Sequence, residues 1–171
     1  MPPYFLDASA LVKYYILEPG STWVRALVDA RKPDDELPIN PILISDASIV
    51  ECAVALAVLC RVNRISRSAQ NGAYRAFMGH IAVSRLRTVT LSTADFHLAA
   101  SFTQRHPLKA YDAVQLAVAL RQHHALSAVK QSLIFVCGDK TLLAAAEAEG
   151  LPTDNPFDHV SPQDTPGRAS S

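Results

Sequence analysis

Four acidic residues differ from the other acids of this chain because each lies at the start or end of an apolar segment. Asp7 and Asp139 follow short apolar runs typical of buried strands, and Glu51 and Asp112 fall in the first turns of apolar, helical segments. In an open parallel α/β sheet, strand ends and the starts of the following helices occupy the same edge. We therefore expect the four carboxylates to face one crevice.

Each acid also has a purely structural explanation. An acid at a helix start accepts a backbone N–H and offsets the helix dipole, which accounts for Asp7 or Asp112 alone. The segment Ser48-Ile49-Val50-Glu51 matches a capping box, in which Glu51 would bond back to the amide of the N-cap residue. It is the repetition of the arrangement that favours a common site.

Carboxylates gathered within a few ångström raise one another's pKa, and at neutral pH they need cations or protons. Oxygen ligands suit Mg²⁺ or Mn²⁺ rather than zinc, and the chain has no HExxH motif. Such an ion can activate water and stabilise the leaving oxygen during attack at phosphorus. No P-loop, GxGxxG motif or GxSxG elbow supports another chemistry. The residues therefore predict metal-assisted phosphodiester hydrolysis.

Short apolar runs alternate with helical patterns along the chain. This alternation predicts an α/β fold with a mainly parallel sheet covered on both faces. One domain is expected over residues 1–157, followed by a flexible tail over 158–171 that is rich in Pro, Ser and Gln. The expected strands are 4–7, 42–46, 88–91, 133–139 and an edge strand in 151–157; the expected helices are 8–17, one from 21, 47–62, 92–105, 110–125 and 140–149.

The composition excludes some classes of protein. Lys plus Arg and Asp plus Glu number 16 each in 171 residues, so net charge indicates no particular partner. Three cysteines in apolar surroundings are typical of a reduced, cytoplasmic protein, and no apolar run is long enough to span a membrane. One segment, 52–94, has no acid and six arginines, which indicates either a polyanionic partner or a solvated surface: Arg61, Arg64, Arg67, Arg75, Arg85 and Arg87.

Four segments together resemble the PIN-domain ribonucleases, and in particular the VapC-type toxins of bacterial toxin–antitoxin pairs. They are Phe5-Leu6-Asp7-Ala8-Ser9-Ala10-Leu11-Val12-Lys13, the helix carrying Glu51, Leu108-Lys109-Ala110-Tyr111-Asp112-Ala113-Val114-Gln115-Leu116-Ala117, and Phe135-Val136-Cys137-Gly138-Asp139. The resemblance covers residues 3–157. It implies a three-layer α/β/α fold, a carboxylate site for Mg²⁺ or Mn²⁺, endonucleolytic cleavage of RNA, a homodimer, and inhibition by a small VapB-type antitoxin.

Carried over by motif, the resemblance implies that Asp7, Glu51, Asp112 and Asp139 form the catalytic and metal-binding quartet. It also implies that the hydroxyl of Ser9 supports the site.

The chain departs from the family pattern at three positions near these acids. Ala8 stands where Thr or Ser is usual, and Gln115 stands where His is common. Cys137 stands two residues before the last acid, where Thr or Ser is usual. A thiol is a weak hydrogen-bond donor, so the support of Asp139 is expected to be weaker.

Two other functions remain open from the residues. The first is a catalytically inactive PIN-like module whose acids only cap helices and whose arginine-rich segment holds RNA or a protein. The second is a phosphatase with Asp7 as nucleophile. That function is less favoured, because Ser9 stands where such enzymes have a second Asp.

Overall fold

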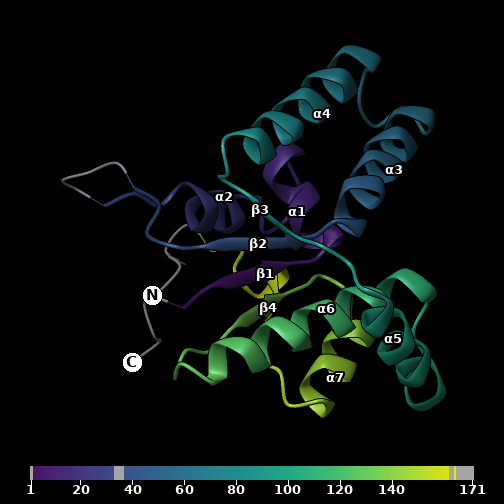
Figure 1. The fold of residues 1–171 in the computed structure, drawn as a ribbon. Coiled ribbons are helices and arrows are strands. Elements are labelled where there is room, and N and C mark those ends of the chain that lie inside the picture. The colour runs from purple at the N-terminus through teal and green to yellow at the C-terminus, as the bar shows by residue number, and fades with distance from the viewer. Residues whose placement is uncertain (1, 33–36, 162–163, 165–171) are drawn as a thin grey trace.

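The centre of the fold is a sheet of five parallel strands (Figure 1) in a computed structural model that describes residues 2–32, 37–161 and 164. The strand order is β3-β2-β1-β4-β5. The strands are β1 (Tyr4–Leu6), β2 (Ile42–Ser45), β3 (Arg87–Val89), β4 (Ile134–Val136) and β5 (Thr153–Asp154). The expected parallel α/β architecture is confirmed.

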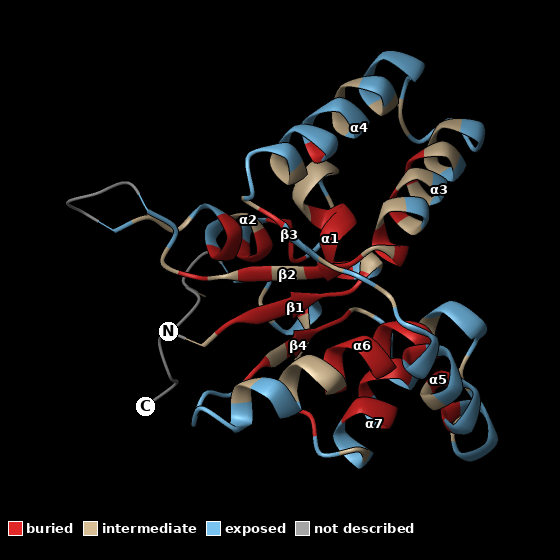
Figure 2. Ribbon diagram, viewed as in Figure 1, coloured by how far each residue is buried: buried red, intermediate tan, exposed pale blue. Residues whose placement is uncertain are grey.

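Helices cover both faces of this sheet and complete three layers (Figures 1 and 2). One face carries α1 (Ala8–Tyr15), α2 (Ser21–Asp29), α3 (Ala47–Arg61) and α4 (Arg67–Ala82). The other carries α5 (Thr93–Arg105), α6 (Ala110–Ser127) and α7 (Lys140–Ala148). None of these described helices is long and apolar enough to cross a bilayer.

The β1 strand is buried on both sides, which explains its uninterrupted apolar sequence. Successive side chains of a strand point to opposite faces. Tyr4 and Leu6 therefore pack with α1 and α2, whereas Phe5 packs with α6 and lies 6.0 Å, centroid to centroid, from the ring of Phe135 on β4. Because β1 lies between β2 and β4, the residue that follows it, Asp7, is at the middle of the sheet edge.

The sequence did not predict helix α4. Its residues give a weak apolar pattern, and only Phe77 of this helix is buried. The helix begins after Ser66, whose hydroxyl accepts a hydrogen bond from the amide of Ala69 at 3.1 Å. It packs against α3 and forms a helical hairpin that extends beyond the sheet (Figure 1).

The six arginines of segment 52–94 lie on this hairpin or at the start of the edge strand β3. Arg85 forms an ion pair with Asp29 of α2, and the other five are exposed. None of the six lines the pocket described below.

The chain after β5 returns to the edge of the sheet near β1. A short 3₁₀ turn, η1 (Pro156–Asp158), packs against α2. Gly20 permits this contact: a Cβ atom there would lie 2.3 Å from the carbonyl oxygen of Pro156, and its φ of +86° is one that glycine adopts freely. In the predicted tail, residues 162–163 and 165–171 are outside the described structure.

Candidate active site

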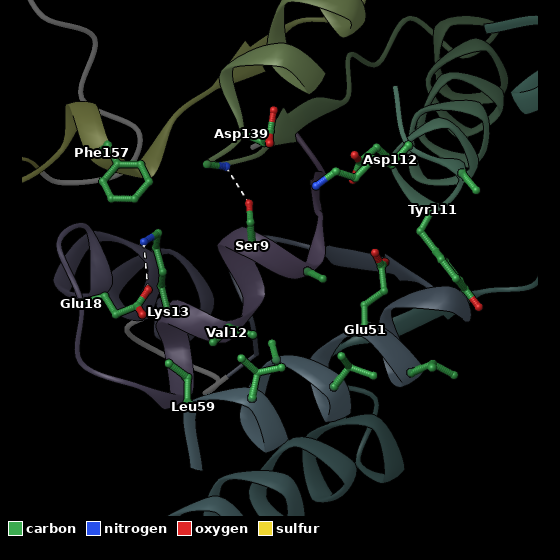
Figure 3. A pocket seen from close by; sticks show the side chains of 18 residues that line it. Ser9, Val12, Lys13, Glu18, Glu51, Leu59, Tyr111, Asp112, Asp139 and Phe157 are labelled. Atoms are coloured by element: carbon green, nitrogen blue, oxygen red, sulfur yellow. Dashed lines mark hydrogen bonds and ion pairs between the residues drawn. The ribbon is translucent and has the colours of Figure 1, made fainter. Parts of the chain in front are cut away.

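A pocket of about 920 Å³ opens where the carboxyl ends of β1 and β4 meet the starts of α1, α3 and α6 (Figure 3). Glu51, Asp112 and Asp139 all line it, together with Ser9. The fourth predicted acid, Asp7, lies beneath Ser9 and is 5% exposed. The structure therefore brings three of the predicted acids to one pocket wall and places the fourth behind it.

Asp7 caps α1 from the end of β1. Its Oδ1 accepts the amide of Ala10 at 3.0 Å and the hydroxyl of Ser9 at 2.8 Å. Burial raises the pKa of this carboxyl, and the two hydrogen bonds oppose the rise only in part. Capping and burial thus coexist at Asp7, so the capping role predicted for it does not exclude a role in the site.

Ser9 links the two halves of the site. Its hydroxyl donates to Asp7 and also accepts the amide of Gly138 at 2.8 Å, across the boundary between α1 and the turn after β4. A Cβ atom at Gly138 would lie 3.2 Å from the same hydroxyl oxygen, so glycine allows this close approach. Ser9 therefore fixes the position of Asp7 relative to the turn that carries Asp139.

Asp139 caps α7 and faces the pocket. Its Oδ1 accepts the amides of Thr141 at 2.8 Å and Leu142 at 3.0 Å. The Cys137 sulfur accepts the amide of Asp139 at 3.2 Å, so the thiol supports the backbone of this turn rather than the carboxylate. The weaker support expected from Cys137 is therefore offset by the two helix amides.

The capping box predicted at Ser48 and Glu51 is wrong. Helix α3 begins at Ala47 with Asp46 as its N-cap residue, so Ser48 is already inside the helix. Glu51 instead accepts a hydrogen bond from the side-chain amide of Gln115 on α6. Burial raises the pKa of Glu51, the nearby charges of Asp7 and Asp112 raise it further, and the bond from Gln115 acts in the opposite direction.

Gln115 is the centre of a buried polar network that sequence reasoning missed. Its side chain is 1% exposed, its oxygen accepts the hydroxyl of Ser45 at 2.8 Å, and its amide nitrogen donates to Ser48 at 2.9 Å as well as to Glu51. The sequence signal was a single amide within the apolar stretch 113–120. Sequence alone could not assign its partners, which come from β2 and α3.

Asp112 lies in the first turn of α6, half-buried at the pocket wall. Burial raises its pKa, and the charge of Asp139 raises it further, while Lys109 lowers it. The acids thus influence one another in sequence around the pocket, from Asp7 to Glu51 to Asp112 to Asp139.

The sequence profile of the PIN domain matches residues 4–131. The chain belongs to the PIN-domain family. Two solved structures share its fold. The first is PAE2754 from Pyrobaculum aerophilum, with a TM-score of 0.59 and 20% identity over 89% of this chain and 83% of that one. The second is VapC20 from Mycobacterium tuberculosis, described as a sarcin–ricin-loop-cleaving toxin, with a TM-score of 0.56 and 17% identity over 83% of this chain and 94% of that one. Curated protein sequences give no match.

The donor groups of this PIN domain are suited to a hard divalent cation. The four acids supply only oxygen ligands, and no described Lys, Arg or His forms an ion pair with any of them. Across residues 2–32, 37–161 and 164, no three His, Cys, Asp or Glu side chains lie close enough to enclose an ion directly. Mg²⁺ needs only one or two carboxylates because it keeps several waters, so the pocket fits that ion.

A buried lysine at the other end of the pocket was also missed. Lys13 is 2% exposed; its ammonium lies 3.3 Å from the carboxylate of Glu18 and 3.8 Å from the centroid of the Phe157 ring. The three residues line the same pocket (Figure 3). Lys13 was part of the family motif in the sequence, but its partners lie in the α1–α2 turn and in η1.

Proposed function

We propose that this PIN domain is a metal-dependent endoribonuclease in which Asp7, Glu51, Asp112 and Asp139 hold Mg²⁺ or Mn²⁺, one or two of them as direct ligands and the others through waters of the ion. The observation that carries the proposal is the mutual arrangement of the acids. Three of them line one pocket, the fourth lies directly behind, and three have pKa values raised by burial. Such perturbed acids in one cavity are typical of functional sites.

The chain's own residues would position the reacting groups. Ser9 orients Asp7, and Gln115 orients Glu51. Lys109 is exposed on the pocket wall, where it can contact a phosphate of the substrate. When bound, the ion would activate water and stabilise negative charge on the phosphate and the leaving oxygen.

The finer form of the proposal is a toxin of the VapC type, restrained by a small VapB-type antitoxin and acting as a homodimer. The described function of VapC20 supports it by likeness of fold.

On α3, Val50, Val54 and Val58 are exposed and line the pocket beside the acids. This apolar stripe suits a protein partner that would close the site. Light scattering of the purified protein would test the dimer.

Cleavage of pooled cellular RNA tests the enzyme directly. With Mg²⁺ or Mn²⁺ we expect discrete fragments, which EDTA abolishes. Asp112→Asn should slow cleavage by more than about 100-fold, the upper end of the losses seen when a group merely supports a metal ligand. Glu147→Gln is a matched control, because Glu147 is an exposed acid on α7 that does not line the pocket.

Two outcomes would reject the enzyme. If EDTA and Asp112→Asn leave the fragments unchanged, the cleavage comes from a contaminant. If antitoxin-free protein binds RNA without cutting it, the acids are structural caps and the inactive binding module is the better description. For the toxin role, expression of the wild-type chain should arrest bacterial growth, expression of Asp112→Asn should not, and co-expression of a cognate antitoxin should restore growth.

A further inference from the structure

Two aromatic rings lie on the walls of the acidic pocket and remain open to solvent. Tyr111 is 51% exposed and Phe157 is 45% exposed, and both line the pocket. Figure 3 shows them on opposite sides of the acids. Large aromatic side chains are usually buried, because burial removes a large apolar surface from contact with water. Two exposed rings in one cavity therefore indicate a ligand.

Each ring is held next to one of the acids. Tyr111 directly precedes Asp112 in the first turn of α6. Phe157 passes so close to Gly138, the residue before Asp139, that a Cβ atom on that glycine would lie 3.1 Å from the Phe157 ring carbon Cε2. Both rings therefore lie close to the place where a substrate would contact Asp112 and Asp139.

Phe157 is fixed in place by several contacts. The ammonium of Lys13 lies over one face of its ring, and its backbone amide donates to Asn155 at 3.0 Å. The preceding residue, Pro156, packs against Gly20, whose lack of a side chain permits the contact. A ring that is already immobilised loses little conformational entropy when a ligand stacks on it.

The surroundings favour a nucleobase over an apolar peptide side chain. Aromatic platforms beside a site that binds phosphates are the usual arrangement for single-stranded RNA, whose bases stack without a sequence requirement. Exposed Lys109 lines the same pocket and supplies a cation for the RNA backbone. The valine stripe of α3 offers neither an aromatic ring nor a cation.

We propose that Tyr111 and Phe157 stack on nucleobases of a single-stranded RNA lying across the acidic pocket. This inference rests on the proposed ribonuclease activity and adds two residues to its substrate-binding surface, Tyr111 and Phe157, on which outward-turned bases of an unpaired segment would stack. Duplex RNA would not provide such bases, because they are stacked within the helix. The two rings are therefore specificity residues for unpaired RNA.

Binding is best measured without cleavage, in the Asp7→Asn background with Mg²⁺, using a fluorescein-labelled 15-nucleotide single-stranded RNA. Tyr111→Leu and Phe157→Leu keep an apolar side chain and remove the π face. We expect each to weaken binding by about 5- to 150-fold, the range for loss of one stacked base. Tyr111→Phe and Phe157→Tyr should bind as the parent does, and Phe96→Leu is the matched control, because Phe96 is 52% exposed on α5 and does not line the pocket.

Two further probes separate stacking from other roles of the rings. An RNA of the same length with abasic residues should bind weakly, and the leucine variants should not weaken it further. An RNA containing 2-aminopurine should lose fluorescence on binding to the parent and lose less on binding to the leucine variants. Melting temperatures would confirm that every variant is folded.

The outcomes distinguish this inference from the proposal beneath it. If wild-type protein cleaves RNA but both leucine variants bind like the parent, stacking is rejected and the ribonuclease stands. The inference is also rejected if the variants weaken abasic and normal RNA equally, which would assign the rings to the fold or to a protein partner. If the parent binds no RNA and wild-type protein cuts none, the ribonuclease and the stacking inference both fail.

Discussion

At the scale of single residues, neutral side chains hold the carboxylates of this PIN domain in place. Ser9 donates to Asp7, and Gln115 donates to Glu51 while also bonding the buried hydroxyls of Ser45 and Ser48. Such partners keep charged groups oriented in a buried site where unpaired polar atoms are costly. Gln115 acts on the site through Glu51 and is a positioning residue.

Replacing Gln115 by Leu should weaken both the fold and the site. The free energy of unfolding is expected to fall by about 1 to 3 kcal/mol, because buried polar partners lose their hydrogen bonds. The pKa of Glu51 should rise, because the bond from Gln115 opposes its upward shift. Mn²⁺ affinity, measured by thermal shift, should fall by about 10- to 100-fold.

An unchanged Mn²⁺ affinity in Gln115→Leu would contradict this role for Gln115. Leucine is close to glutamine in size, so the variant keeps the packing and removes only the hydrogen bonds. If the role of Gln115 were purely structural, the free energy of unfolding in urea would change and Mn²⁺ affinity would not. Val114→Ala is a useful comparison, because it removes a neighbouring buried side chain of α6 that does not line the pocket. It should destabilise the fold and leave the affinity unchanged.

The sequence was sufficient to find the acids and insufficient to find their partners, and the reason is physical. An acid at the end of an apolar run is visible locally, since the run itself predicts a strand or helix that ends there. The partner of Glu51 is 64 residues away, and that of Ser9 is 129 residues away. Only the packing of α6 on β2, and of β4 beside β1, brings them together.

At the scale of elements, the strands β1, β2 and β4 were predictable because each is an apolar run closed by polar residues, and most helices because they are strongly apolar. Helix α4 was missed because it packs through a narrow stripe and is otherwise polar. The start of the helix predicted over 92–105 was correct: α5 follows Ser92, which forms a capping box with Asp95. The structure adds a second role for Asp95, which also binds Arg121 of α6.

The pairing of α5 with α6 should depend on Arg121. Its guanidinium donates to both carboxylate oxygens of Asp95, at 2.7 and 3.0 Å, and to the carbonyl of Thr90 at 2.9 Å. The Asp95 side chain is 2% exposed, so Arg121→Met would leave a buried charge with fewer partners. We expect unfolding in urea to become easier by roughly 2 kcal/mol.

Arg105→Met provides the comparison for that measurement. Arg105 also joins α5 to a neighbour, through Glu149, but its side chain is 53% exposed. Exposed ion pairs contribute little, so its loss should cost less than about 1 kcal/mol. Equal losses for Arg121→Met and Arg105→Met would show that the burial of Asp95 has no energetic consequence.

At the scale of the whole molecule, the site should make the protein sensitive to pH and to divalent cations. The pKa values of Asp7, Glu51 and Asp112 are raised, mainly by burial. Between the ordinary pKa of about 4 and these raised values, the folded chain binds more protons than the unfolded chain. These three carboxyl groups therefore contribute stability below the ordinary pKa. That contribution is lost as the pH rises through their raised pKa values in the folded state.

Mn²⁺ should restore that stability. At about 100 times its dissociation constant, a bound ion adds about 2.7 kcal/mol to the free energy of unfolding, which corresponds to a rise in Tm of roughly 5 to 10 °C. The rise should be larger at pH 7.5 than at pH 5, because protons compete for the carboxylates at the lower pH. Thermal melts with and without Mn²⁺ would measure it, and an equal rise in Asp112→Asn would place the ion elsewhere.

The strand order β3-β2-β1-β4-β5 has a consequence for the life of the chain on the ribosome. Residues 1–131 contain three of the four acids, yet at that length β1 is still an edge strand, and Ser9 has no Gly138 amide to accept. A nascent chain that stops there carries most of the acids but has no assembled pocket. The order of synthesis itself therefore delays the formation of the site until β4 and the turn that carries Gly138 and Asp139 have been made.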